Sequence, residues 1–140
     1  MSDARVRLYA DGASRGNPGL GGAGSVFVDE SGNVVGSLKK FVGHCTNNEA
    51  EYHALILGLE EAVRRGYNRL DIFLDSELVV RQVTGAYRVK SKSLLKYIIQ
   101  VRNLLSLIDG YRIAHIDRSH NRMADQLANE AIDEHLKSNR

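Results

Sequence analysis

The segment YADGASRGNPGLGGAG (residues 9–24) constrains the fold more than any other, because six of its residues are glycine and one is proline. Glycine and proline disfavour a helix, so this segment belongs to turns and strands. The segment nevertheless matches two motifs that require a helix directly after them. Gly12 to Gly16 fits the G-x-S-x-G pattern of serine hydrolases, and Gly19 to Gly24 fits the G-x-G-x-x-G pattern of dinucleotide-binding loops.

Apolar periodicity predicts the elements around this segment. Strands are expected over 6–10, 25–28 and 34–42, with a turn over 29–33. Thr46 and Glu49 have capping-box spacing, which predicts a helix to about Arg65, before Gly66. A strand over 71–74, helices over 77–83 and 93–108, and a strand over 111–116 follow. The last helix is capped near Asn121, and its predicted buried face consists of Ala124, Leu127, Ala128, Ala131 and Leu136. The order β-β-β-α-β-α-α-β-α implies an α/β fold with a mixed sheet flanked by helices.

This order argues against both glycine motifs. A dinucleotide loop needs a helix directly after its glycines, whereas residues 25–28 alternate as a strand. The serine motif likewise needs a helix after Ser14. Asp75 and His120 do follow Ser14 in the chain order of a Ser-Asp-His triad, so a serine hydrolase stays open as a remote alternative. The glycines themselves are expected in turns between hairpin strands, where they would also let another backbone, such as RNA, approach closely.

Length and composition limit the class of protein. A chain of 140 residues with 43% hydrophobic content suits one globular domain. The net charge of +2 permits contact with phosphates but does not diagnose nucleic-acid binding. No apolar run has the length of a signal peptide or membrane span, and the single cysteine, Cys45, cannot form an internal disulfide. We therefore expect a cytoplasmic protein that does not bind membranes, and a monomer without an obligatory protein partner.

Four carboxylates occupy positions where a solvated surface charge is not expected. Asp11 and Asp75 each end a predicted strand, so neighbouring strands would bring them to one edge of the sheet. Glu51 lies on the inward stripe of its helix, and Asp125 lies one turn before the inward Ala128. Without cations such a cluster would repel itself and raise its own pKa values. Because carboxylate oxygens suit Mg²⁺, the sequence predicts a metal site at these four acids.

The same residues lie in motifs that resemble those of the type 1 ribonucleases H. Asp11-Gly12 with Gly16 to Gly19 is similar to the first-strand motif, and Thr46-Asn47-Asn48 with Glu51 to the first-helix motif. Leu74-Asp75-Ser76 is similar to the third motif, and residues 121–128 to the last. The resemblance implies the ribonuclease H-like fold, in which a five-stranded mixed sheet combines a three-strand antiparallel meander with two parallel strands. It also implies one catalytic domain over residues 1–140, without a separate hybrid-binding domain.

The implied activity is hydrolysis of the RNA strand of an RNA/DNA hybrid, which leaves 5′-phosphate and 3′-hydroxyl ends. In this family water attacks between two Mg²⁺ ions, for which Mn²⁺ can substitute. The resemblance assigns Asp11 to both metals, and Glu51, Asp75 and Asp125 to their remaining ligand positions. It places further residues near the ribose 2′-hydroxyl or a DNA phosphate. These residues, expected to contact the hybrid, are Gly12, Asn17, Thr46, Asn47 and Asn48.

Two departures from the family's pattern leave alternatives open. A short link over 84–93 replaces the Trp- and Lys-rich protrusion of many members, and the chain has no tryptophan.

His120 lies only five residues before Asp125, closer than the mobile histidine of the family lies to its final aspartate. Two roles for His120 therefore stay equally open, a proton shuttle and a plain loop histidine. The fold also occurs as a non-catalytic binding module and in domains associated with reverse transcriptases. Since all four acids are present, we expect an independent enzyme.

Overall fold

The computed structural model describes residues 4–139. Its strands are β1 (Val6–Gly16), β2 (Gly19–Val28), β3 (Val34–Cys45), β4 (Arg69–Leu74) and β5 (Gly110–His115). Its α-helices are α1 (Asn47–Arg65), α2 (Glu77–Val83), α3 (Lys92–Leu105) and α4 (Arg122–Ser138), with a short 3₁₀ helix, η1 (Arg118–His120), before α4. The predicted order of strands and α-helices is confirmed. Of the helices described, none is long and apolar enough to span a membrane.

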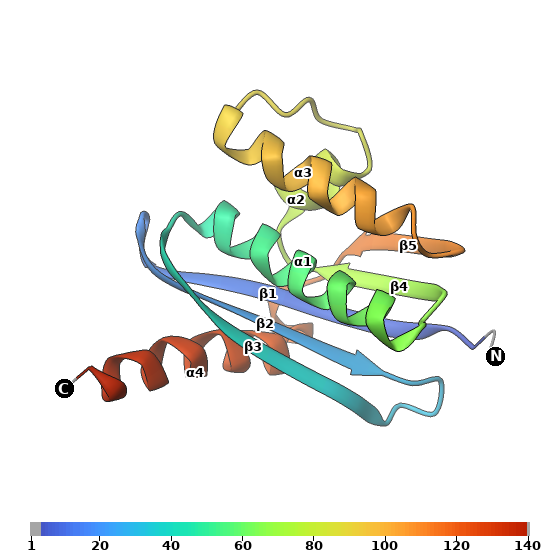
Figure 1. The fold of residues 1–140 in the computed structure, drawn as a ribbon, viewed down its shortest axis with the longest axis horizontal. Coiled ribbons are helices and arrows are strands. Elements are labelled where there is room, and N and C mark those ends of the chain that lie inside the picture. The colour runs from blue at the N-terminus through green and yellow to red at the C-terminus, as the bar shows by residue number, and fades with distance from the viewer. Residues whose placement is uncertain (1–3, 140) are drawn as a thin grey trace.

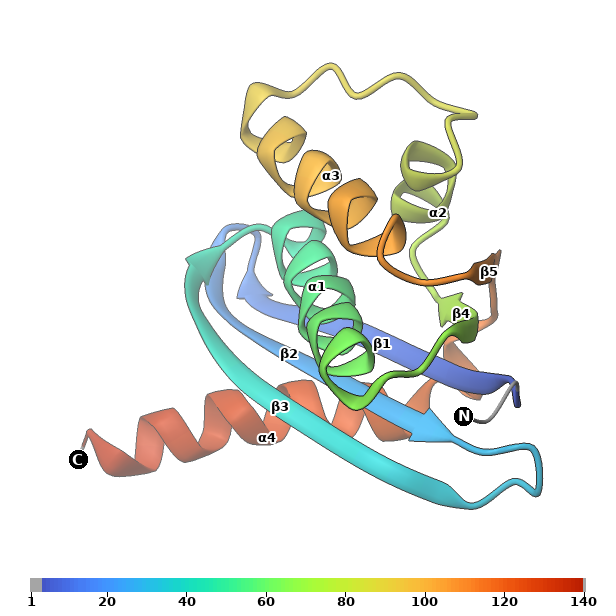
Figure 2. The ribbon, with the colours of Figure 1, turned by 45° about the vertical axis from the view of Figure 1, so that its right-hand side comes forward.

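One five-stranded mixed sheet forms the centre of the molecule, in the order β3-β2-β1-β4-β5. β1, β2 and β3 pair antiparallel, whereas β4 is parallel to both β1 and β5, which confirms the predicted combination of meander and parallel strands. Figures 1 and 2 show α1 and α3 on one face of the sheet and α4 across the other. The main hydrophobic core lies between the sheet, α1 and α3, where Leu8, Leu55 and Ile98 are fully buried.

The glycine-rich segment forms strands rather than a cluster of turns. β1 and β2 run through it as an antiparallel pair. A Cβ atom on Gly22 would lie 2.1 Å from the carbonyl oxygen of Ala128, and one on Gly24 would lie 2.2 Å from that of Ala124. The expectation of turn glycines is therefore wrong at these two positions, because their missing side chains let α4 pack directly on β2.

A close backbone contact also fixes α1 against β1. The capping box is confirmed, because Thr46 Oγ1 accepts a hydrogen bond from Glu49 N (3.2 Å) and Glu49 Oε1 accepts one from Thr46 N (3.0 Å). Gly66 ends the helix in the left-handed conformation, as predicted. A Cβ on Gly12 would lie 2.1 Å from the carbonyl carbon of Ala50, so the first turns of α1 lie directly against β1.

The terminal helix differs from the prediction at both ends. Asn121 occupies the N-cap position, but its side chain makes no capping bond and instead donates from Nδ2 to the carbonyl oxygen of Ala10 (2.9 Å). Leu136 is 43% exposed rather than buried. The helix still lies against the sheet at this point, because the ring of the preceding residue, His135, stacks on Phe41 of β3 with centroids 3.6 Å apart. The remaining predicted face is confirmed as buried or half-buried, and consists of Ala124, Leu127, Ala128 and Ala131.

Candidate active site

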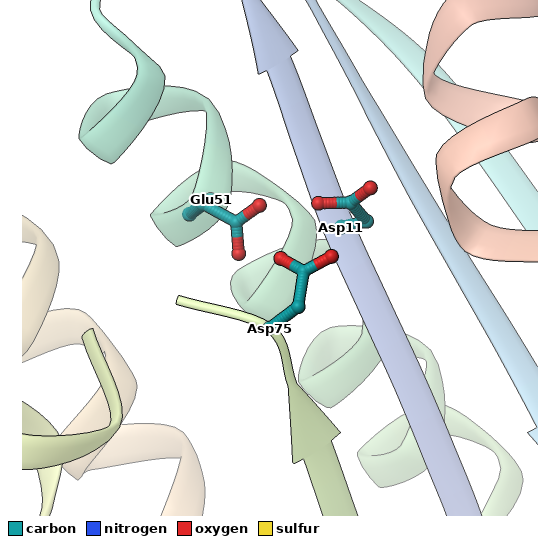
Figure 3. Close-up of side chains that lie close together, drawn as sticks. All are labelled: Asp11, Glu51 and Asp75. Atoms are coloured by element: carbon teal, nitrogen blue, oxygen red, sulfur yellow. The ribbon is translucent and has the colours of Figure 1, made fainter. Parts of the chain in front are cut away.

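Three of the four predicted acids come together at one edge of the sheet. Asp11 belongs to β1, Glu51 to α1, and Asp75 follows the last residue of β4. One carboxylate oxygen from each residue lies within 4.8 Å of the other two. Figure 3 shows the three carboxylates pointing toward one another. They line a cleft of about 460 Å³, which is therefore the candidate active site.

Local structure explains why these side chains meet. β1 and β4 are parallel neighbours in which Ala10 pairs with Leu74, so the next residue of each strand emerges at the same edge, as predicted. Glu51 Oε1 accepts a hydrogen bond from the backbone N–H of Gly12 (2.8 Å), which ties the helix to the strand. Asp11 and Glu51 are only 4% and 5% exposed. The cluster is therefore fixed by the backbone and largely removed from bulk water.

Burial and mutual repulsion raise the proton affinity of this cluster. Burial raises the pKa of Asp11 far above its ordinary value, and the hydrogen bond and charge of Glu51 and the charge of Asp75 raise it further. Burial also raises the pKa of Glu51 to about 7, although hydrogen bonds with Asp11 and Gly12 oppose this shift. Three negative charges are thus unfavourable here at neutral pH unless a proton or a cation compensates them.

The carboxylate oxygens have the properties of metal ligands. Glu51 Oε2 and Asp75 Oδ2 are buried and have no hydrogen-bond partner. Buried acceptors in proteins normally have a donor or a cation beside them. An all-oxygen, anionic set suits a hard divalent cation such as Mg²⁺ or Mn²⁺ better than a soft metal. The chemistry of the cluster therefore fits the metal site that the sequence predicts.

Asp125 lies beside this group but is not one of the three acids whose oxygens are within 4.8 Å of one another. It belongs to the first turn of α4, and its carboxyl contributes to the raised pKa of Asp11. Its Oδ1 atom accepts a hydrogen bond from Asn129 Nδ2 (3.3 Å) and lies 3.9 Å from Arg118 Nη2. A fourth ligand from α4 stays a prediction.

Several residues of the cleft were not identified from the sequence as site residues, among them Arg15, Arg118 and Asn129. Arg118 and Asn129 both line it, and the positive charge of Arg118 lowers the pKa of Glu51. Asn129 lies four residues after Asp125, and this helical spacing is a signal from which it could have been found. Arg118 carries no comparable signal, because it lies on η1, outside the predicted elements.

The residues expected to contact a hybrid lie in and beside the cleft. Gly12, Asn47 and Asn48 line it. Asn17 and Thr46 instead bond the start of α1. Asn17 Oδ1 accepts a hydrogen bond from Asn47 N (3.1 Å), and Thr46 caps the helix. These contacts join the β1–β2 hairpin to the start of α1. Substrate binding by the five residues stays a prediction.

The serine-hydrolase alternative does not have its geometry. The Ser14 hydroxyl donates to the carbonyl oxygens of Gly16 and Cys45, the latter at 2.8 Å. His120 lines a different cleft, together with Tyr9 and Met123. Ser14 and His120 therefore belong to separate surfaces rather than to one triad. His120 is also absent from the lining of the carboxylate cleft, so its role as a proton shuttle stays a prediction.

Sequence comparisons match this chain to one family profile and to several individual proteins. The reverse transcriptase-like family profile matches residues 9–131. The chain is 43% identical to ribonuclease HI of Halobacterium salinarum, over 93% of this chain and 65% of that protein. It is 30% identical to a ribonuclease H of Methylococcus capsulatus, over 99% of this chain and 96% of that protein. It spans less than two thirds of the relatives with the highest identity, including 36% of a bifunctional protein of Mycobacterium tuberculosis.

Solved structures agree with the sequence comparisons. The crystal structure of the Halobacterium salinarum protein, an RNase H1, matches with a TM-score of 0.90 and covers 93% of this chain and 98% of its own. LC11-RNase H1, crystallised in complex with an RNA/DNA hybrid, is 37% identical and matches with a TM-score of 0.88. That match covers 94% of this chain and 99% of the other.

Proposed function

Because this chain belongs to the ribonuclease H family, we propose that it is an endoribonuclease that cuts the RNA strand of RNA/DNA hybrids, leaving 5′-phosphate and 3′-hydroxyl ends. One observation carries the proposal: three carboxylates meet within 4.8 Å, and two of them present buried oxygens that lack partners. The crystallised complex of LC11-RNase H1 with a hybrid supports the substrate class. We further propose that residues 1–140 act as one cytoplasmic, monomeric catalytic domain that uses Mg²⁺.

The residues that would hold the metal ions are Asp11, Glu51, Asp75 and Asp125. When bound in such a site, divalent cations activate water and stabilise the oxygen that leaves phosphorus. The chain itself need not supply a nucleophile, which agrees with the engagement of the Ser14 hydroxyl by two carbonyl groups. The chain's own contribution is to bring negative charges together at one point and to fix the carboxylates there. The hydrogen bond from Gly12 N to Glu51 Oε1 fixes one of them.

The polar groups around the carboxylates suit an RNA strand. Asn47 and Asn48 line the same cleft, and their amides can both donate to and accept from a ribose 2′-hydroxyl, which DNA lacks. We assign Asn17 and the backbone of Gly12 to the same hydroxyl, and Thr46 to a phosphate of the DNA strand. The Arg118 side chain is 81% exposed beside the cleft, which suits contact with a backbone phosphate.

The test uses end-labelled RNA/DNA hybrid, duplex RNA and duplex DNA, each with Mg²⁺, Mn²⁺ or EDTA. We expect cleavage of the RNA strand of the hybrid, with metal only. Asp75→Asn should abolish it, because this change removes a metal ligand while preserving shape. Asp71→Asn is the matched control on the same strand, since Asp71 pairs with Arg5 (3.2 Å) outside the cleft. Cleavage in EDTA, or equal activity of the two variants, would refute the proposed mechanism.

A further inference from the structure

Asp75 is held less directly than Glu51. Its Oδ2 atom is buried without a partner, and the contact at 3.2 Å from His115 Nε2 is to its backbone oxygen rather than to its carboxylate. The Glu51 carboxylate, by contrast, accepts a hydrogen bond from Gly12 N. The position of the Asp75 carboxylate therefore depends on the two elements that flank it, the end of β4 and the start of α2.

α2 needs contacts with the rest of the protein to hold its place. It has seven residues, and a helix of two turns is not stable alone. Ser76, directly after Asp75, is its N-cap and accepts a hydrogen bond from Val79 N (3.3 Å). Apolar burial of Val79, Val80 and Val83 attaches the helix to the core but has no directional preference. A directional contact would add to this packing in fixing its orientation.

A buried hydrogen bond supplies that contact. The hydroxyl of Tyr52 donates to Gln82 Oε1 at 2.7 Å. Among the residues that the structure describes, it is the one side-chain hydrogen bond that joins α2 to another element. Tyr52 is 0% exposed and Gln82 5% exposed, so water does not compete for this bond. The Tyr52 ring also stacks on Tyr97 of α3, with centroids 6.0 Å apart, which restricts where its hydroxyl can point.

One end of this bond lies next to a clustered acid in the chain, and the other lies on the helix that follows a second clustered acid. Tyr52 directly follows Glu51 on α1, and Gln82 belongs to the helix whose cap directly follows Asp75. Neither residue lines the cleft. We infer that Tyr52 and Gln82 are positioning residues, whose hydrogen bond sets the separation of the Glu51 and Asp75 carboxylates and thereby the affinity for metal. This inference rests on the proposed metal role of Glu51 and Asp75.

The expected effect is moderate. Groups that bond directly to metal ligands typically change metal affinity by about 10- to 100-fold when removed. Tyr52 and Gln82 act one step further away, through the backbone, so we expect Mn²⁺ binding to weaken by about 3- to 10-fold. Tyr52→Phe removes only the donor, and it also leaves Gln82 Oε1 buried without a partner, which lowers stability.

The experiment measures Mn²⁺ binding without nucleic acid, by the electron paramagnetic resonance signal of free Mn²⁺, alongside hybrid cleavage and thermal unfolding. The variants are Tyr52→Phe, Gln82→Met and the double variant. Tyr67→Phe is the matched control, because Tyr67 accepts a hydrogen bond from Arg65 Nη1 (3.4 Å) beyond the opposite end of α1. The double variant removes both polar groups, so its stability should recover, since no buried group is left unpaired.

We expect weaker Mn²⁺ binding in both single variants and in the double variant, and wild-type binding in Tyr67→Phe. The metal concentration for half-maximal cleavage should rise by the same factor, with little change in KM for the hybrid. Wild-type Mn²⁺ affinity in Tyr52→Phe, or recovery of affinity together with stability in the double variant, would overturn the inference and leave a purely structural bond. A wild-type protein that binds Mn²⁺ but cuts no hybrid would refute the proposed function alone.

Discussion

Replacing Asp11 by asparagine should stabilise the metal-free protein while abolishing its activity. The carboxylate oxygens of Asp11, Glu51 and Asp75 lie within 4.8 Å of one another. At an effective dielectric constant of 20, two unit charges at this distance repel by about 3 kcal/mol, and a cluster that avoids this repulsion must keep a proton that the unfolded chain has lost at pH 8. Asparagine keeps the shape of the side chain, and its amide can donate to one of the unpartnered oxygens. We expect the free energy of unfolding in EDTA at pH 8 to rise by about 3 kcal/mol, or about 10 °C in Tm.

This gain should depend on pH. The pKa of Asp11 is raised above its ordinary 3.8, chiefly by burial, and burial raises that of Glu51 from 4.5 to about 7. The folded wild-type protein therefore binds more protons than the unfolded chain above pH 4. Its stability is highest below the unfolded pKa values; the contribution of Glu51 is lost as pH rises to about 7, and that of Asp11 continues to be lost as pH rises toward about 11. The difference between Asp11→Asn and wild type should be small at pH 4 and large at pH 8.

Thermal and urea unfolding in EDTA between pH 4 and pH 8 measure this difference, and the same series in Mg²⁺ measures the effect of the cation. Mg²⁺ should raise the Tm of wild type more than that of the variant, because it binds the folded site and offsets the repulsion. Asp109→Asn, an exposed change outside the cluster, should leave Tm unchanged. A Tm for Asp11→Asn at or below that of wild type in EDTA at pH 8 would refute the repulsion argument.

Other substitutions test single features of the site. Glu51→Gln should lower kcat by orders of magnitude, whereas Glu49→Gln alters only the capping box and should cost about 1 kcal/mol of stability or less; equal loss of turnover would contradict the assignment of Glu51. Ser14→Ala should keep most hybrid cleavage, and a dead variant with wild-type Tm would revive the serine mechanism. Gly12→Ala should lower the urea midpoint strongly, because its Cβ would overlap the Ala50 backbone. His120→Ala should lower kcat partially and equally at low and moderate salt if the imidazole transfers a proton; a wild-type kcat would exclude that role.

The parts of the fold that follow local rules could be predicted from the sequence. The bonds that cap α1 lie between Thr46 and Glu49, three residues apart, so their spacing alone predicts the start of the helix. Asp11 and Asp75 could be brought together by one general rule, because the carboxyl ends of neighbouring parallel strands meet at the same edge. Glu51 followed from the apolar stripe of its helix. These arguments need no knowledge of contacts between distant segments beyond the pairing of two strands.

The features that escaped prediction depend on contacts between distant segments. Gly22 and Gly24 have the local preferences of turn residues, and only the packing of α4 on β2 shows why a side chain is excluded. Asn121 has the chemistry of a helix cap, yet its amide bonds Ala10, which is 111 residues away. Leu136 continues the apolar pattern of α4, but no part of the protein covers it fully, since it is 43% exposed. A sequence pattern gives the direction of a side chain but not the extent of the surface opposite it.

The connections of the sheet make the cleft independent of the acids that line it. The chain leaves β4 toward the face that carries α1 and α3, and it leaves β5 toward the opposite face, where α4 lies (Figure 2). The cleft at the ends of β1 and β4 thereby receives residues from both faces of the sheet, Glu51 from α1 and Asn129 from α4. The recess thus depends on the course of the backbone, whereas each acid depends on the identity of a single residue. Under the proposed function, a protein without the Asp75 carboxylate would keep this recess and lose a metal ligand, so a nucleic-acid-binding protein would differ from the enzyme at a single residue.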